Sequence, residues 1–494
     1  MQHSVCLARH KSSSEYFCIM DMRIGGTFLP SESGTFFSVL NPAYNMVCDT
    51  APVSSYADVH HAVEVADGAF SIWSEEEPIS RAKVLFRAAQ RVRDDSTSLS
   101  SLLTQEQGKP LRESINEIQG FARVLEYYAS ICSSIHGDYS YSKAYGHSFV
   151  VKQPIGVCAA IIPWNVPALI MGWKVGSALA AGCSVVLKPA STAPLTCLRL
   201  GEILDDSGLP PGALNIITGP GAVVGEALAA HPDIAAVSFT GEIETGKHLA
   251  QKISPSLKRL TLELGGSDPM IVCADASIQK AVAGAVAGRF FNCGQICVST
   301  KRLLVDASIY DRFIDELMQA MKHIVPGDGM HPKTTMGPLN NHAQKEAVSK
   351  QVQDTIDAEQ GTLSYQGTMS EHADPNGFFL PPMLLTDVSP DASIMQQEVF
   401  GPVLPICPFT SVDEAIDLAN STRYGLGASI WTNNMETVHN IAPAIRSGIV
   451  WVNQHLKIPP EVPFGGVKES GFGRENGYQA LDHYLVEKSV LIKL

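Results

Sequence analysis

A cysteine in the second half of the chain has the chemistry of a nucleophile. Cys297 closes the segment Asn-Cys-Gly-Gln-Ile-Cys, residues 292–297, which follows a pattern typical of a small-residue helix. A thiol attacks a carbonyl carbon as the thiolate, so its pKa must fall below the free value of about 8.5 through backbone amides or a nearby cation. A lone cysteine in such a segment is otherwise a small buried hydrophobic residue, and both interpretations stay open here.

A glutamate stands at the end of an apolar run. Glu263 lies between Leu262 and the sequence Leu-Gly-Gly of residues 264–266. Burial at this place would raise the pKa of the carboxyl group and suit it to proton transfer. The alternative is a solvated charge at the end of a strand.

Two glycine-containing turns are placed where phosphate groups bind. Gly219, Gly221 and Gly225 stand between an apolar strand and a helix, where backbone amides approach a pyrophosphate. Their spacing is one residue longer than the usual dinucleotide fingerprint, and a plain strand-to-helix turn is the alternative. Thr240 and Gly241 follow a second strand and open a second helix, which favours the nucleotide interpretation.

The elements that must position these residues have the pattern of a layered α/β fold. Short β-branched runs alternate with amphipathic helical patterns, which favours a parallel sheet. The expected strands are residues 157–162, 184–187, 214–217, 235–239 and 269–273, and the last precedes a helix over 281–291 that stops at residues 292–294. An earlier helix has one apolar face, formed by Val84, Leu85, Ala88, Ala89 and Val92.

Two further segments have the pattern of exposed β structure. Residues 137–151 alternate tyrosine and serine like a hairpin, and the tail 489–494 is strand-like. Because exposed strand edges need covering, we expect both segments to pair with another subunit.

Composition excludes several classes of protein. The 494 residues, 45% hydrophobic and 17% charged, predict a compact chain of two or three domains. With 36 basic and 50 acidic residues the net charge is −14, so nucleic acid is not an expected partner. The 11 cysteines lack the spacing of metal sites, so we expect no metal, reduced thiols and a reducing compartment.

Targeting signals are weak. The N-terminal segment around Arg9 continues into the polar run 12–15 and has no apolar core of a secretory signal. We predict a cytoplasmic protein and leave a mitochondrial presequence open. The most apolar stretch, 157–187, is interrupted by prolines, Asn165 and Lys174, so we expect no membrane span.

Taken together, the motifs resemble the aldehyde dehydrogenase superfamily. The resemblance is specific because separate motifs recur in the family's chain order over nearly the whole sequence. They are EQGK (106–109), PWN (163–165), KPA (188–190), FTG (239–241), ELGG (263–266), GQIC (294–297), EVFGP (398–402) and PFGG (463–466).

The resemblance implies an α/β fold of three parts. A Rossmann-type cofactor domain would comprise residues 1–131 and 152–264, and an α/β catalytic domain residues 265–469. A small β oligomerisation element would comprise residues 132–151 and 480–494. Members of this family assemble through such an element, so a homodimer or homotetramer is expected.

The resemblance also implies a reaction. Cys297 would attack the aldehyde carbonyl, with the oxyanion held by the Asn165 side-chain amide and the Cys297 backbone amide. Hydride would leave to NAD(P), and Glu263 would activate the water that hydrolyses the thioester to a carboxylic acid. Relatives that acylate coenzyme A usually lack this glutamate; such an enzyme, or a structural protein on the same fold, is the alternative function.

By the same resemblance, Glu398 and Phe400 would align the nicotinamide ribose and ring, and Lys188 would bond the adenosine ribose. The full expected cofactor set is Ile162, Trp164, Lys188, Ser191, Gly221, Gly225, Thr240, Gly241, Glu242, Leu264, Glu398 and Phe400.

Two of these positions depart from the family pattern. Many NAD-preferring relatives have glutamate where this chain has Ser191, so we hypothesise that NADP is accepted here as well as NAD, and is preferred. Glu242 replaces a common serine, and a glutamate beside phosphate is unfavourable unless it points away.

The expected substrate pocket is mainly apolar and suits aliphatic or aromatic aldehydes. It would be lined by Val166, Ile170, Trp173, Ile296, Val298 and Phe464. His455 and Lys457 would lie near its mouth, either to attract a carboxylated semialdehyde or simply as solvated surface residues. Arg302 is either a substrate clamp or a structural partner.

Overall fold

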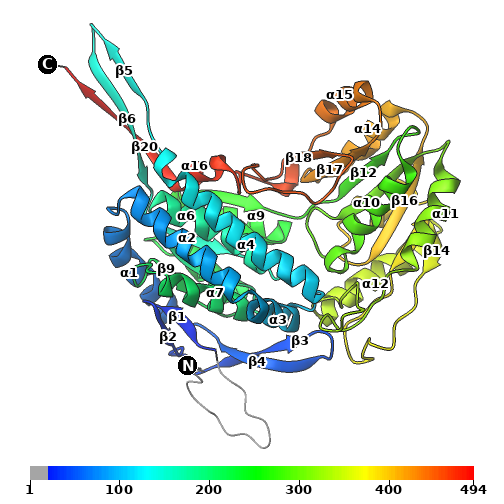
Figure 1. Cartoon of the computed structure of the whole chain (residues 1–494), viewed down its shortest axis with the longest axis horizontal. Coiled ribbons are helices and arrows are strands. Elements are labelled where there is room, and N and C mark those ends of the chain that lie inside the picture. The colour runs from blue at the N-terminus through cyan, green and yellow to red at the C-terminus, as the bar shows by residue number, and fades with distance from the viewer. Residues whose placement is uncertain (1–19, 494) are drawn as a thin grey trace, which may run out of the picture.

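The computed structural model describes residues 20–493. Figure 1 shows two lobes, one built mainly from the N-terminal half of the chain and one from residues further along, with a narrow β arm that projects from the first lobe. The expectations for Arg9, residues 12–15 and Leu494 lie outside the described residues. Within residues 20–493, every helix is too short or too polar to cross a bilayer.

The first lobe contains an eight-stranded sheet. In order across the sheet its strands are β19 (Gly471–Phe472), β11 (Arg259–Glu263), β10 (Ala236–Thr240), β7 (Val157–Ile161), β8 (Ser184–Lys188), β9 (Leu214–Ile216), β1 (Met22–Ile24) and β2 (Thr27–Leu29). The five strands from β11 to β9 are parallel. Numbered in chain order they read 5-4-1-2-3, the order of a dinucleotide-binding sheet with its switch point between β7 and β10.

The strand register brings the predicted site residues to one edge of this sheet. Ile161 pairs with Lys188, Phe239 with Ile161, and Thr240 with Glu263. Since these strands are parallel, their carboxyl ends lie together, and ligands of such sheets bind outside those ends. Four separate sequence motifs therefore meet at the switch point.

Helices cover both faces of this sheet (Figure 1). They are α1 (Tyr56–Trp73), α2 (Pro78–Asp94), α3 (Ser96–Gln107), α4 (Leu111–Ile131), α5 (Pro167–Met171), the π-helical turn η2 (Gly172–Gly176), α6 (Ser177–Ala181), α7 (Leu195–Asp206), α8 (Glu226–Ala230) and α9 (Ile243–Ile253). The apolar face predicted from Val84 to Val92 belongs to α2 and is buried, as expected.

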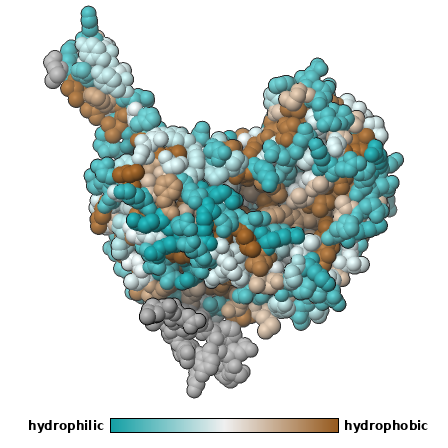
Figure 2. Space-filling model, viewed as in Figure 1, coloured by the Kyte–Doolittle hydropathy of each residue, from teal (hydrophilic) through white to brown (hydrophobic). Residues whose placement is uncertain are grey.

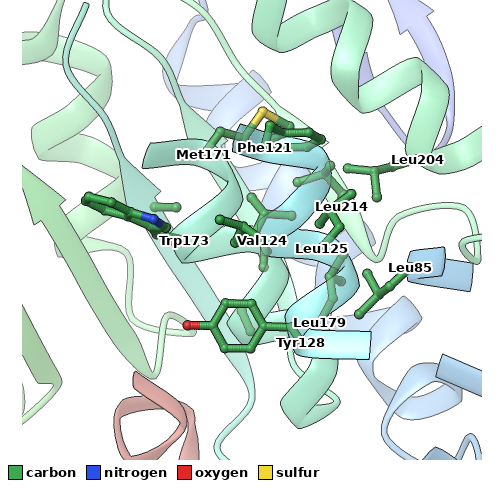
Figure 3. Packing of buried hydrophobic residues seen from close by; sticks show 14 of the residues in the cluster. Leu85, Phe121, Val124, Leu125, Tyr128, Met171, Trp173, Leu179, Leu204 and Leu214 are labelled. Carbon is green, nitrogen blue, oxygen red and sulfur yellow. The ribbon is translucent and has the colours of Figure 1, made fainter. Parts of the chain in front are cut away.

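The core of the first lobe lies between α4 and the helices after β7. On α4, Phe121, Val124, Leu125 and Tyr128 are spaced i, i+3, i+4 and i+7, so they share one face. Figure 3 shows this face packed beside Met171, Trp173 and Leu179. Asn165 lies two residues before α5, and α5 leads directly to Met171 and Trp173. The packing of α4 against these residues therefore helps to fix the position of Asn165.

The second lobe contains a seven-stranded sheet. Its strands in order are β14 (Thr362–Gln366), β15 (Met383–Thr386), β16 (Val403–Phe409), β13 (Thr300–Asp306), β12 (Asp268–Val272), β17 (Gly427–Trp431) and β18 (Ile449–Val452). All neighbours are parallel except β14, which is antiparallel to β15. Its helices are α10 (Ile278–Phe290), α11 (Tyr310–Met321), α12 (His342–Asp357), α13 (Ser393–Gln396), α14 (Val412–Asn420) and α15 (Met435–Ala444).

The arm corrects the expectation for the two exposed segments. Strands β5 (Tyr139–Ser142), β6 (Gly146–Pro154) and β20 (Leu485–Ile492) form one sheet in the order β20-β6-β5. The tail strand begins at residue 485 rather than 489 and pairs with β6 of its own chain along eight residues. The hairpin therefore does not need another subunit to cover β6, and the edges left open are those of β5 and β20.

The remaining elements are short. A two-stranded sheet pairs β3 (Phe36–Asn41) with β4 (Met46–Pro52). Single turns are η1 (Cys132–Ser134), η3 (Gly221–Gly225), η4 (Ser254–Ser256), η5 (Phe291–Gly294), η6 (Lys468–Ser470) and η7 (Tyr478–Ala480), and α16 (Leu481–Tyr484) precedes β20.

Candidate active site

A tight turn presents the cysteine segment between α10 and β13. The three successive residues Asn292, Cys293 and Gly294 have φ of 47°, 57° and 74°. Gly294 is the one position here that excludes a side chain, because a Cβ would lie 2.3 Å from the carbonyl oxygen of Gly401. The turn therefore ends α10 abruptly and directs the chain to Cys297.

Polar contacts from distant elements hold this turn. The Asn292 backbone N–H donates to the Glu113 carboxylate at 2.8 Å, and its side-chain amide donates to the Asn165 carbonyl at 2.9 Å. The Gln107 amide donates to the Asn292 side-chain oxygen at 3.0 Å. Lys109 donates to the Asn165 carbonyl at 2.6 Å. Gln107 and Lys109 of the EQGK motif thus hold the cysteine turn and Asn165 in place.

Cys297 is partly buried as a residue, whereas Cys293 in the same segment is 1% exposed. Burial raises the pKa of the Cys297 thiol to about 12. The cation of Lys301 acts in the opposite direction, and the carboxylates of Glu398, Asp268 and Glu263 reinforce the rise. The thiol is therefore protonated at neutral pH in the ligand-free site, and attack on a carbonyl requires a proton acceptor.

Asn165 lies beside this segment with unused hydrogen-bonding capacity. It is 4% exposed, its amide donates to the Gln295 carbonyl at 3.0 Å, and its side-chain oxygen has no partner in the part of the chain that the structure describes. The Cys297 backbone N–H also donates to no group within the described residues. The two predicted oxyanion donors thus belong to adjoining segments, and each has an N–H left to donate.

Glu263 is buried, so the solvated-charge interpretation is wrong. It is 2% exposed, and neither carboxylate oxygen has a hydrogen-bond partner in the described part of the chain. Burial raises its pKa well above the usual value, and Glu475 reinforces the rise. A Cβ at Gly465, in the PFGG motif, would lie 2.7 Å from Glu263 Oε1, so this glycine makes room for the carboxylate.

A buried ion pair between Lys174 and Glu475 lies near Glu263. Neither residue belongs to a motif that was identified in the sequence. Lys174 donates to the Glu475 carboxylate and, at 2.7 Å, to the hydroxyl of Ser238. Ser238 in turn donates to Glu475 at 2.8 Å. Burial is the main cause of the raised pKa of Glu263; Glu475 adds to the rise and Lys174 opposes it, so the ion pair modulates the protonation of the candidate base.

The carboxyl edge of the first sheet has features that fit a dinucleotide. The buried Lys188 ammonium donates, within the described residues, only to the Pro189 carbonyl, and burial lowers its pKa to about 8. The Thr240 hydroxyl has no hydrogen-bond partner among residues 20–493. A Cβ at Gly221 would meet nothing within 4 Å. Unused donors and open backbone at the switch point are what a ribose and pyrophosphate require.

Two cofactor expectations take a different local form. Gly221–Gly225 is a π-helical turn that leads into α8 instead of an open loop. The Ser191 hydroxyl donates to the Gly219 carbonyl at 2.8 Å, so it must rotate before it can donate to a phosphate. Glu242 is exposed just before α9 and makes no side-chain capping bond.

Of the remaining cofactor candidates, Glu398 and Phe400 lie beside Lys301 in β13. Glu398 forms an ion pair with Lys301 at 3.1 Å and accepts from the Gly266 N–H at 3.3 Å. The Phe400 and Trp164 rings meet edge to face, 5.6 Å apart. The backbone N–H of Ile162 donates to the Lys188 carbonyl, and that of Leu264 to the Ser470 carbonyl.

The predicted pocket residues gather in one apolar cluster. The Trp173 and Phe464 rings are 5.1 Å apart, and the same cluster contains Val166, Ile170, Ile296 and Val298. A cavity of about 300 Å³ lies elsewhere, between α4, α10 and the end of α11, with Arg112 and Phe291 in its wall. None of the predicted pocket residues lines that cavity.

The structure decides between the interpretations of the mouth residues. His455 is buried, bonds the Val298 carbonyl at 2.8 Å and has its pKa lowered to about 4 by burial, so it is neither a surface residue nor a cation. Lys457 is exposed. Arg302 donates to the carbonyls of Ser267, Leu418 and Ala419, which makes it a structural residue and not a clamp.

Comparison with known proteins agrees with this geometry. The family model described as the aldehyde dehydrogenase family matches residues 28–490. The chain belongs to the aldehyde dehydrogenase family. It is thus an enzyme that oxidises an aldehyde to the carboxylic acid with reduction of NAD(P), and its fold is the predicted α/β fold with a Rossmann-type sheet and a second α/β sheet.

Individual relatives are similar over almost their full length. Betaine aldehyde dehydrogenase 1 of Oryza sativa subsp. japonica is 40% identical over 476 residues, 94% of each chain. Phenylacetaldehyde dehydrogenase of Pseudomonas fluorescens is 39% identical over 481 residues, 95% of each chain. A crystal structure of a betaine aldehyde dehydrogenase point mutant from Staphylococcus aureus, in complex with NAD+ and with a BME-modified cysteine, has a TM-score of 0.93 and 33% identity, and covers 96% of this chain and 97% of that one.

Proposed function

We propose that Cys297, Asn165 and Glu263 carry out the oxidation. The observation that supports this most directly concerns the Cys297 segment, where two N–H donors are unused and the buried Glu263 carboxylate, which has no hydrogen-bond partner within residues 20–493, acts on the thiol. Nucleophile, oxyanion donors and base are the groups that acyl chemistry on a carbonyl carbon needs.

The reaction runs in two halves. The Cys297 sulfur bonds to the aldehyde carbon, the thiol proton passes to a base, and the carbonyl oxygen becomes an oxyanion that the Asn165 amide and the Cys297 N–H stabilise. Loss of hydride from that carbon leaves a thioester on Cys297. Glu263 then takes a proton from a water molecule whose oxygen attacks the thioester carbon, the C–S bond breaks, and the acid leaves.

The cofactor would be held at the carboxyl edge of the first sheet. Lys188, Ser191, Thr240 and Gly221 would bind its ribose and phosphates, and Glu398 with Phe400 its nicotinamide end. NAD(P), when bound, supplies the acceptor for the hydride. The unused donors at this edge support the assignment.

Asn165→Ala is expected to lower kcat by roughly two to three decades, because loss of one oxyanion donor costs about 2.7–4 kcal/mol of transition-state stabilisation. Steady-state turnover with saturating aldehyde and cofactor measures it. Asn376→Ala, an exposed asparagine remote from these contacts, is the control and should leave kcat unchanged. A kcat for Asn165→Ala equal to the parent would remove this residue from the mechanism.

We propose aliphatic or aromatic aldehydes as substrates, since the six predicted pocket residues, Trp173 and Phe464 among them, are all apolar. A panel of aldehydes, assayed with each cofactor and without coenzyme A, tests the function. Acid formed without coenzyme A, fastest from apolar aldehydes, supports a hydrolytic enzyme. Turnover that depends on coenzyme A would contradict the hydrolytic role proposed for Glu263, and slow turnover of every apolar aldehyde would contradict the proposed substrate class.

Ser191 is proposed to let the enzyme accept NADP and prefer it. Ser191→Glu should lower kcat/KM for NADP about tenfold or more, since a carboxylate beside the 2′-phosphate costs at least about 1.4 kcal/mol. The value for NAD should change less, and Ser191→Ala separates loss of the hydroxyl from gain of charge. A parent enzyme with a strong preference for NAD would contradict the proposal.

A homodimer or homotetramer is proposed to form through the arm. Its exposed side chains include Tyr141, Tyr145 and Leu491, the last 63% exposed, and Figure 2 shows brown residues along the arm below a teal tip. An apolar surface with open strand edges favours association. Sizing chromatography should give a dimer or tetramer, and monomeric elution would contradict this.

We propose that the chain divides into three functional parts. The cofactor domain comprises residues 1–131 and 152–264, the catalytic domain residues 265–469, and the oligomerisation element residues 132–151 and 480–494.

A cytoplasmic location is proposed because all nine cysteines within residues 20–493 are free thiols.

A further inference from the structure

Lys301 is a fully buried cation beside the cysteine loop that none of the sequence motifs includes. It is the second residue of β13 and is 0% exposed. Its ammonium donates to the carbonyl of Ile296 at 2.7 Å and to that of Cys297 at 2.6 Å. Its third contact is the ion pair with the Glu398 carboxylate at 3.1 Å. All three N–H bonds therefore have acceptors.

The stability of the fold alone does not explain why a lysine is buried at position 301. Burying an ammonium is costly, and a buried ion pair is seldom more stabilising than well-packed apolar residues. The nearby Arg289 already joins β13 to the segment after Glu398, through the carbonyls of Thr300 and Val399. Lys301 adds only the contacts to the cysteine loop and to the Glu398 side chain.

We propose that Lys301 is a positioning residue that holds the Cys297 loop and the Glu398 carboxylate in one fixed arrangement, so that the nucleophile and the nicotinamide end of the cofactor site are built together. The proposal rests on the proposed roles of Cys297 and Glu398. The Lys301 ammonium also lies 5.6 Å from the centroid of the Phe400 ring, so this proposed nicotinamide contact belongs to the same arrangement.

The arrangement has an electrostatic consequence. The charged groups that face the Cys297 thiol are Lys301, Glu398, Asp268 and Glu263, and only the first favours the thiolate. Removing the lysine charge therefore raises the pKa of the thiol. Below that pKa the thiolate fraction falls tenfold for each unit of rise, and alkylation falls in proportion.

The test is the rate of Cys297 alkylation by iodoacetamide, measured against pH without aldehyde or cofactor. We expect Lys301→Met to react about tenfold more slowly than the parent at a fixed pH, with its profile moved to higher pH. In turnover, the KM for NAD(P) should rise because Glu398 loses its partner. Lys322→Met, an exposed lysine on the surface, is the control and should leave the profile unchanged.

Lys301→Gln is the second variant, since it removes the charge and keeps a donor for the carbonyls. A parent-like alkylation profile in a folded neutral variant would overturn the proposal. Loss of folding in both variants would also overturn it, by making Lys301 a residue of fold stability. The proposed function fails by a different result, namely full turnover after Cys297 has been alkylated.

Discussion

Cys297→Ala is expected to abolish aldehyde oxidation, with kcat lowered roughly 10⁴-fold or more. Without the sulfur no covalent intermediate forms, and loss of a nucleophile that acts in concert with its base and oxyanion donors removes nearly all of the catalysis. The formation of reduced cofactor from a good aldehyde substrate measures this. Because the residues proposed to bind NAD(P) are unchanged in this variant, cofactor affinity should stay within a few-fold of the parent.

Cys293→Ala is the matched control. This cysteine lies four residues away in the same segment, is buried, and has its pKa raised by burial. Alanine occupies the same left-handed backbone region at no greater cost, so most of the turnover should remain. If Cys297→Ala retained turnover within tenfold of the parent, the nucleophile would have to be another group.

Glu263→Gln is expected to stop the reaction after hydride transfer. A single burst of reduced cofactor, close to one per active site, should precede a steady state slowed by roughly 10²–10⁴-fold, the usual contribution of a general base. Glutamine keeps the size of the side chain but cannot accept the proton of water. Stopped-flow absorbance gives the burst amplitude, and Glu461→Gln, an exposed glutamate, should behave as the parent.

The pH dependence of the parent follows from the same carboxyl group. Burial and Glu475 raise the pKa of Glu263, so the carboxylate is the active form only above that raised value. The deacylation rate should therefore fall as the pH drops through a range higher than the usual glutamate pKa of about 4.3. This limb of the pH profile should be absent in Glu263→Gln, and its persistence there would assign the base to another residue.

The positions of Thr240 and Glu263 were predictable because their strands are short, apolar and followed by turns. Parallel strands end at the same edge of a sheet, so residues at their carboxyl ends converge whatever their separation in the chain. Lys188 and Ile162, which the family resemblance assigned to the cofactor, lie at, or directly after, the ends of two further strands of this sheet. The motif resemblance then gave these positions chemical roles that the strand pattern alone does not contain.

The supports of the site were not predictable in this way. Lys301 lies in a strand whose residues 300–305 are all buried, so the alternation that would indicate its direction is missing. Gln107 meets Asn292 across 185 residues of sequence, which no local pattern encodes. The tail strand was expected to pair with another subunit because a pattern of exposed residues shows that an edge needs a partner, but not which strand provides it.

The most direct test of the central claim is to locate the covalent intermediate. Glu263→Gln is mixed with one equivalent of aldehyde and excess NAD(P), quenched, digested with trypsin, and the peptide 290–301 is sequenced by tandem mass spectrometry. We expect the acyl group of the substrate on Cys297 and an unmodified Cys293. An acyl group on any other residue, or an unmodified peptide after a full burst of reduced cofactor, would contradict the assignment of Cys297 as the nucleophile.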